Sequence, residues 1–201
     1  MQMDDKIAKV LDIYHARIRD EREMRDTGGS RDDRLLAVGP DTGQLINILA
    51  RSLPAPHIVE LGTSYGYSGI WLAEAARATG GRVTTMELQP DKSRYAKAMS
   101  EQAGLAAHVD FQVGNAVDLI GKLDADVDFV LVDLWKDLYV PCLEALYPKL
   151  RPGAILVADN MIHPRLDDTA PYAKAVRAKP GLETVRLPVG SGLDISRYVG
   201  G

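Results

Sequence analysis

Three polar residues that follow two apolar stretches of the sequence could together bind a divalent cation. The run FVLVD ends at Asp133, and the run AILVAD ends at Asp159, which Asn160 follows directly. We expect both runs to be neighbouring strands of one parallel sheet, which would bring the three side chains together at its carboxyl edge. Two carboxylates and an amide oxygen are hard ligands that suit Mg²⁺ or Mn²⁺. Each side chain alone would more often cap a helix or lie in a turn, but their occurrence together at adjacent strand ends favours a metal site.

Lys136 lies three residues beyond Asp133 and could act as a general base. A nearby divalent cation disfavours the charged ammonium, so we expect the pKa of Lys136 to be lowered. A neutral amine in this position could take a proton from a bound hydroxyl group. The alternative is a solvated surface lysine, which is the commoner fate of lysines.

A glycine turn between a predicted strand and a predicted helix indicates a nucleoside-type cofactor. The turn is Gly62-Thr63-Ser64-Tyr65-Gly66, and its glycines allow the backbone to approach a ligand closely. Its spacing lacks the middle glycine of the dinucleotide fingerprint Gly-x-Gly-x-x-Gly, and no Gly-Lys-Ser/Thr of a P-loop follows. An ordinary strand–helix connection is the alternative reading of the turn taken alone.

Glu87 supports the cofactor interpretation. It ends the second predicted strand, about 20 residues beyond the turn, where a carboxylate can accept hydrogen bonds from both ribose hydroxyls. The turn and Glu87 together therefore favour a nucleoside-type cofactor over a simple connection.

The remaining pattern supplies the elements that must position these residues. Apolar runs alternate with helical stretches, which predicts an α/β fold: a Rossmann-like, doubly wound, mostly parallel sheet with helices on both faces. The predicted strands are 57–61, 83–87, 109–113, 127–133 and 154–159, and the predicted helices are 67–79, 91–103, 116–122, 139–150 and 169–178. The runs 183–189 and 193–199 flank Gly190-Ser191-Gly192 and predict a C-terminal antiparallel hairpin.

The N-terminal quarter is predicted to be helical. Residues 3–24 and 41–52 have helical apolar spacing, 25–34 read as a mobile loop, and Asp41 and Asp91 are plausible N-caps. We expect a single domain over 1–201, with 1–52 as a helical cover. The apolar stripe of the first helix fits packing on the domain or a dimer contact, so both a monomer and a homodimer remain open.

Composition excludes several classes of partner. The chain has 201 residues, of which 46% are apolar, and a net charge of −4 from 24 basic and 28 acidic residues. No basic stripe indicates a nucleic-acid partner, and no apolar run has the length of a membrane helix. Cys142 is the single cysteine, so no internal disulfide can form and we expect a reduced, cytoplasmic setting.

Four motifs carry a family resemblance. VELGTSYGYSG, TMELQPD, VDLWKDLY and VADN occur in this order and resemble catechol O-methyltransferase and related metal-dependent small-molecule O-methyltransferases. These are class I methyltransferases that use S-adenosylmethionine (SAM), and the resemblance covers about residues 36–199. Its most specific part runs from Asp133 to Tyr139 and is more similar to the catechol enzymes than to their caffeoyl-CoA relatives.

The resemblance implies SAM as cofactor, Mg²⁺ or Mn²⁺ bound by Asp133, Asp159 and Asn160, and Lys136 as the base that acts on a small phenolic substrate with vicinal hydroxyls. The positions that it places at the cofactor are Val38, Glu60, Gly62, Ser64, Tyr65, Gly66, Tyr67, Ser68, Glu87, Leu88, Gly114, Asn115, Ala116, Asp133 and Trp135. The positions that it places at the substrate are Lys136, Trp135, Asn160, Pro164 and Asp194.

Three departures from the family pattern bear on substrate and cofactor contacts. Leu134 stands where the catechol enzyme has a histidine beside the adenine, and Asp194 is one methylene shorter than the family's glutamate. The N-terminal loop is short and charged, so we expect a different substrate wall. Two alternatives stay open: a metal-independent SAM methyltransferase with another nucleophile, and a SAM-binding partner subunit without catalysis. A dehydrogenase is disfavoured by the glycine spacing.

Overall fold

The protein is built on a seven-stranded sheet. A computed structural model describes residues 4–23, 34–124 and 126–200. The strand order is β3-β2-β1-β4-β5-β7-β6, and every pair from β3 to β5 is parallel, whereas β7 runs antiparallel to both β5 and β6. The strands are β1 (His57–Leu61), β2 (Arg82–Glu87), β3 (Val109–Val113), β4 (Val127–Val132), β5 (Leu150–Ala158), β6 (Leu182–Leu187) and β7 (Leu193–Tyr198). The predicted doubly wound sheet with a C-terminal hairpin is confirmed.

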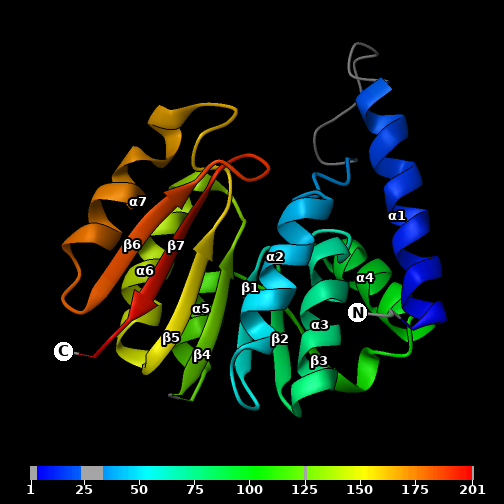
Figure 1. The fold of residues 1–201 in the computed structure, drawn as a ribbon, viewed down its shortest axis with the longest axis horizontal. Coiled ribbons are helices and arrows are strands. Elements are labelled where there is room, and N and C mark those ends of the chain that lie inside the picture. The colour runs from blue at the N-terminus through cyan, green and yellow to red at the C-terminus, as the bar shows by residue number, and fades with distance from the viewer. Residues whose placement is uncertain (1–3, 24–33, 125, 201) are drawn as a thin grey trace.

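Helices cover both faces of the sheet (Figure 1). The α-helices are α1 (Asp5–Glu23), α2 (Pro40–Arg51), α3 (Tyr67–Thr79), α4 (Pro90–Gln102), α5 (Ala116–Lys122), α6 (Tyr139–Leu146) and α7 (Leu166–Ala178). Helices α1 to α4 pack on one face and α5 to α7 on the other. None of these helices, within the ranges described, is long and apolar enough to cross a membrane.

The central strands are apolar on both faces because helices cover both. In β4, Phe129 and Leu131 pack toward α1 to α3, whereas Val130 and Val132 pack toward α5 to α7. All four are at most 2% exposed. The two-residue alternation of a strand therefore fills two separate cores.

Proline explains why two helices begin one residue before their predicted caps. Helix α2 starts at Pro40 after Gly39, and α4 starts at Pro90 after Gln89; neither N-cap makes a side-chain capping bond. The predicted caps Asp41 and Asp91 are therefore wrong, and both lie in the first turn of their helix. Proline suits the first helical position because its φ is preset and it has no N–H to leave unpaired.

Other element boundaries also differ from the sequence prediction. Helix α6 ends at Leu146, and Tyr147–Lys149 continue as a 3₁₀ turn that contains Pro148, which has no N–H for the helical ladder. Strand β5 begins at Leu150 rather than at 154, with an irregular register against β4. Helix α7 begins at Leu166 rather than at 169. The predicted loop 25–34 lies, except for its last residue, outside the described residues.

Five parallel strands end at the same edge of the sheet and position the candidate site. Leu61, Glu87, Val113, Val132 and Ala158 are their last residues. The glycine turn, Gly114-Asn115, Asp133 and Asp159-Asn160 directly follow these ends, in the crevice where sheets of this type bind their ligands.

Candidate active site

The glycine turn brings the end of β1 against the end of β4. Gly62 has φ +98°, and a Cβ there would collide with the carbonyl oxygen of Asp133. Gly66 has φ +89°, and a Cβ there would collide with Ala96 of α4. Both positions therefore require glycine. As a result, the cofactor turn and the candidate metal ligand Asp133 lie in direct contact.

Glu87 lies beside this turn. Its carboxylate accepts hydrogen bonds from the backbone N–H of Ser64 at 2.8 Å and of Gln89 at 3.0 Å. Ser64 itself has φ +46°, which is uncommon for a residue with a side chain. The predicted ribose-binding carboxylate thus also holds the turn, and the adjacent Leu88 is 63% exposed.

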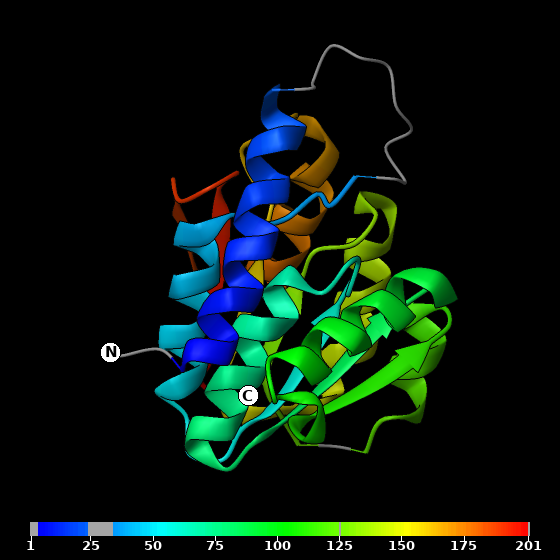
Figure 2. The ribbon, with the colours of Figure 1, turned by 90° about the vertical axis from the view of Figure 1, so that its right-hand side faces the viewer.

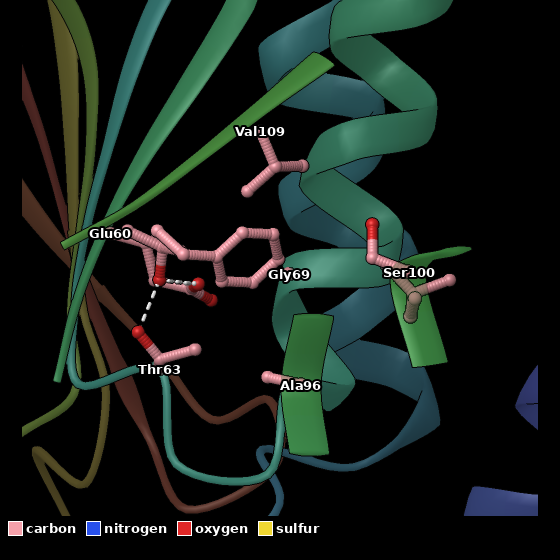
Figure 3. Close-up of a pocket in the computed structure, with 10 residues that line it drawn as sticks. Glu60, Thr63, Gly69, Ala96, Ser100 and Val109 are labelled. Atoms are coloured by element: carbon pink, nitrogen blue, oxygen red, sulfur yellow. Dashed lines mark hydrogen bonds between the residues drawn. The ribbon is translucent and has the colours of Figure 1, made fainter. Parts of the chain in front are cut away.

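Glu60, near the end of β1, is completely buried. Figure 3 shows its side chain close to Thr63 of the turn. Its carboxylate accepts hydrogen bonds from Ser68 at 2.6 Å and Thr85 at 2.5 Å, and Thr85 also bonds to Thr63. Burial raises the pKa of Glu60 to about 7, against the stabilising effect of the two hydroxyl donors on the carboxylate. Through these hydrogen bonds, Glu60 and Ser68 help to hold the turn in position.

The other predicted cofactor positions surround the same edge. Gly114 and Asn115 follow β3, and the Asn115 side chain accepts from the N–H groups of Val117 and Asp118 to cap α5. Tyr65, within the turn, and Tyr67, the first residue of α3, both contact Tyr14 of α1. The positions not yet described are Val38, which is buried in the core, Ala116, the first residue of α5, and Trp135, which is 52% exposed.

The three predicted metal ligands come together at the ends of β4 and β5. Asp159 is 1% exposed, and its carboxylate accepts the N–H of Asn160 at 2.7 Å. Burial raises the pKa of Asp159 to about 8, with a further contribution from the negative charge of Asp133. Burial also raises the pKa of Asp133, although Lys136 acts in the opposite direction. The proximity of the two carboxylates therefore disfavours the state in which both are charged.

Lys136 completes this cluster. Its ammonium donates to Asn160 Oδ1 at 2.5 Å, to the Tyr139 hydroxyl at 2.6 Å and to the Leu134 carbonyl at 3.2 Å. Asp133 Oδ1 lies 3.6 Å from the same nitrogen. The structure thus brings the predicted base and the predicted metal ligands together.

Tyr139 is a member of the cluster to which the sequence assigned no role. It accepts from Lys136 and donates to the backbone carbonyl of Asp159 at 3.1 Å. Its spacing of three residues from Lys136, at the start of α6, is the sequence signal for this contact. Tyr139 links the two strand ends and orients the lysine.

The cluster has the chemistry of a divalent-cation site. The buried carboxylate of Asp159, the partly buried carboxylate of Asp133 and one amide oxygen lie together, with the Lys136 ammonium next to Asp133 and Asn160, and such oxygens suit Mg²⁺. Within the described residues, no group of three or more His, Cys, Asp or Glu side chains could hold a metal. The candidate donor set is of a different kind, because it combines two carboxylates with the side-chain amide of Asn160.

Asp194 has a different environment from the one expected of a substrate contact. Its buried carboxylate pairs with Arg177 at 2.7 Å and with Arg186 at 2.7 and 3.0 Å. The arginines lower its pKa against the effect of burial. Both oxygens of Asp194 are therefore already engaged, whereas the predicted substrate position Pro164 is exposed.

The strand order, the glycine turn after β1 and the acid at the end of β2 define a class I SAM-dependent methyltransferase. A model of an O-methyltransferase family matches residues 21–199. The chain belongs to this family of SAM-dependent O-methyltransferases.

Known relatives agree with this assignment. A catechol O-methyltransferase of Niastella koreensis is 33% identical over 80% of this chain and 76% of its own length. The mouse catechol O-methyltransferase is 35% identical over 76% of this chain. The matched part covers 60% of the length of the mouse enzyme. The O-methyltransferase TomG of Streptomyces achromogenes, solved in complex with SAM, is 27% identical, with a TM-score of 0.78 over 99% of this chain and 92% of that one.

Proposed function

We propose that this enzyme transfers the methyl group of SAM to one hydroxyl of a small vicinal diphenol, with a divalent cation bound by Asp133, Asp159 and Asn160 and with Lys136 as general base. The observation that carries the proposal is the contact of Lys136 with Asn160 and Asp133, at the point where Gly62 meets the backbone of Asp133. Base, metal ligands and cofactor turn thus share one edge of the sheet. The similarity to two catechol O-methyltransferases supports this substrate class.

When bound, a divalent cation lowers the pKa of a coordinated hydroxyl and fixes its orientation, and SAM supplies the methyl group. Lys136 is positioned to remove the proton from the attacking hydroxyl at Nζ. A cation bound by the neighbouring carboxylates would repel the Lys136 ammonium and so favour the neutral amine that this role requires. Tyr139 and Asn160 keep the amine directed at the site through their bonds to Nζ.

Glu87 and the glycine turn would bind and orient the cofactor. The Glu87 carboxylate is positioned to accept the ribose hydroxyls, and its bond to the Ser64 N–H keeps the turn in place. Holding both reactants in one orientation removes much of the entropic part of the barrier. The exposed ring of Trp135, next to Lys136, would flank the bound aromatic substrate.

A substrate panel tests the proposal. Catechol, a monophenol such as 4-methylphenol, and caffeoyl-CoA are each incubated with SAM and Mg²⁺, with and without EDTA, and the methylated products are identified by mass spectrometry. We expect rapid methylation of catechol, loss of that activity in EDTA and negligible turnover of the monophenol. Equal turnover of the monophenol, or caffeoyl-CoA as the preferred acceptor, would contradict the diol proposal.

A metal-independent methyltransferase is the second candidate, and one observation favours it. The Lys136 ammonium already donates to Asn160 Oδ1 and lies next to Asp133. A lysine in this position could neutralise part of the acidic cluster without a metal ion. Activity that resists EDTA and gains nothing from added Mg²⁺ would support this candidate over the first.

A further inference from the structure

Helix α1 packs against α3 and α4, and Figure 2 shows it as the dark blue helix in front of α3. Tyr14 of α1 is fully buried, and its hydroxyl donates to the backbone carbonyl of Tyr65 at 2.6 Å. The same hydroxyl would lie 3.4 Å from a Cβ at Gly66. The turn is therefore in direct contact with a helix that is far from it in sequence.

Arg17, one helical turn further along α1, makes a second contact with the turn. Its guanidinium carbon lies 4.2 Å from the centre of the Tyr65 ring, and its Nε pairs with Glu21 at 3.0 Å. Tyr65 also makes an edge-to-face contact with Tyr95 of α4, with ring centres 5.4 Å apart. The Tyr65 side chain is thus held between two helices.

Glu21 of α1 is connected to Ser64 of the turn through the backbone of Leu35. Its Oε1 accepts the backbone N–H of Leu35 at 2.8 Å, and the Leu35 carbonyl accepts the Ser64 hydroxyl at 3.2 Å. The N–H of Ser64 in turn donates to Glu87. A chain of hydrogen bonds therefore runs from α1 to the carboxylate assigned to the ribose.

Ordinary packing does not account for these polar contacts. Ile7, Val10 and Leu11 form a separate apolar stripe, at most 3% exposed, that packs α1 on the domain. The contacts of Tyr14, Arg17 and Glu21 instead all reach the turn or the segment at Leu35. They also support Ser64 in its positive-φ conformation, which needs such external partners to persist.

We propose that Tyr14, Arg17 and Glu21 form a clasp that holds the glycine turn in its cofactor-binding conformation, so that docking of α1 and binding of SAM are coupled. These three are positioning residues, since none of them is placed against the reacting atoms. Because coupling between two events is reciprocal, bound cofactor should also stabilise α1 on the domain. The inference rests on SAM binding at the turn and is independent of the metal and of the methyl acceptor.

The test measures the binding of S-adenosylhomocysteine (SAH) by calorimetry in variants of the clasp. Tyr14→Phe removes one hydroxyl bond to a backbone carbonyl and keeps the ring. Its matched control is Tyr147→Phe, which removes the same type of bond, to Pro180 at 2.7 Å, far from the turn. Glu21→Ala is paired with Asp20→Ala, and Arg17→Ala with Arg19→Ala, because Asp20 and Arg19 are exposed on the same helix.

We expect each clasp variant to bind SAH about three- to tenfold more weakly, the effect of one lost hydrogen bond. The KM for SAM should rise by a similar factor, while kcat and the KM for the acceptor at saturating SAM stay near their wild-type values. The controls should leave all four constants unchanged. In hydrogen-exchange mass spectrometry, SAH should slow exchange in residues 5–23 of the wild type and slow it less in Tyr14→Phe.

Two outcomes would overturn the clasp. One is SAH affinity within twofold of wild type in all three clasp variants, whatever their melting temperatures. The other is α1 exchange that SAH does not alter in the wild type. Failure of the wild-type enzyme to bind SAH at all would instead overturn the proposed function, so the two failures are distinguishable.

Discussion

The Lys136 ammonium donates to the side-chain oxygen of Asn160 at 2.5 Å, across the gap between the ends of β4 and β5. A residue predicted as base and a residue predicted as metal ligand therefore share a hydrogen bond. With Asp133 at 3.6 Å and the Tyr139 hydroxyl at 2.6 Å, the lysine is fixed from several sides. This geometry has consequences that can be measured.

Replacing the lysine should affect the chemical step alone. We expect Lys136→Ala to reduce kcat by about 100- to 10,000-fold, the usual contribution of general acid–base catalysis, and to leave SAH affinity unchanged. Lys136→Arg should not restore activity, because a guanidinium stays protonated. Lys122→Ala, at an exposed lysine of α5, is the control. Retention of a tenth or more of wild-type kcat by Lys136→Ala would exclude this role.

Removal of one candidate metal ligand should change the response of the protein to Mg²⁺. Mg²⁺ that binds only the folded state raises the melting temperature of the wild type. In Asp159→Asn this rise should disappear, and the variant without metal should melt at a higher temperature than the wild type, because burial and the nearby charge of Asp133 make the Asp159 carboxyl retain a proton that the unfolded chain loses, a cost that the neutral amide avoids. An equal Mg²⁺-induced rise in both proteins would show that the ion binds elsewhere.

The raised pKa of Asp159, about 8, predicts the sign of the pH dependence of metal affinity. Below this pKa a proton competes with the metal for the carboxylate, so metal binding must release it. Mg²⁺ affinity measured by calorimetry should therefore increase between pH 6.5 and pH 8.5. A flat or opposite dependence would contradict the participation of Asp159.

Glu60 predicts a pH dependence of folding stability. Its pKa is raised from 4.5 to about 7 in the folded protein, so the folded state retains a proton that the unfolded state has lost. Stability should therefore fall as pH rises through this interval, by up to roughly 3 kcal/mol. In cofactor-free and metal-free protein, Glu60→Gln should match the wild type near pH 4.5 and melt at a higher temperature at pH 8. A temperature difference that is constant with pH would contradict the assignment.

Asp194 distinguishes a structural role from a substrate contact. Asp194→Asn leaves Arg177 and Arg186 without their carboxylate and should destabilise the fold by about 3 kcal/mol, with little change in the KM for catechol. Because the arginines lower its pKa, this contribution is present at neutral pH and is lost on acidification through the folded pKa. An increased KM at an unchanged melting temperature would instead support the contact with the second hydroxyl that the family resemblance implies.

The sequence was most informative at the ends of the strands. The carboxyl ends of parallel strands lie at one edge of a sheet, so apolar runs ending at Asp133 and Asp159 were enough to predict that these residues lie close together. The glycine spacing was equally informative, because Gly62 and Gly66 face backbone and side-chain atoms that exclude a Cβ. Local pattern and topology determine such features together.

Other features depend on long-range packing and were not accessible from the sequence. Arg177, one of the two arginine partners of Asp194, lies on α7, and no local pattern links it to β7. The other partner, Arg186, faces Asp194 across the predicted hairpin. The burial of Glu60 depends on packing with Ser68 of α3 and Thr85 of β2, which bond to its carboxylate. The caps failed for a local reason, since Pro40 and Pro90 favour the first helical position more strongly than the acids that follow them favour the cap.

The central claim is that a divalent cation at Asp133, Asp159 and Asn160 enables methyl transfer to a diol. Its most direct test is the rate of catechol methylation by enzyme treated with EDTA and then titrated with Mg²⁺. We predict that the stripped enzyme still binds SAH, is about 100-fold or more slower, and recovers its full rate as Mg²⁺ saturates one site, whereas Asp133→Asn recovers none. A stripped enzyme that methylates catechol at the full rate without added metal would contradict the claim.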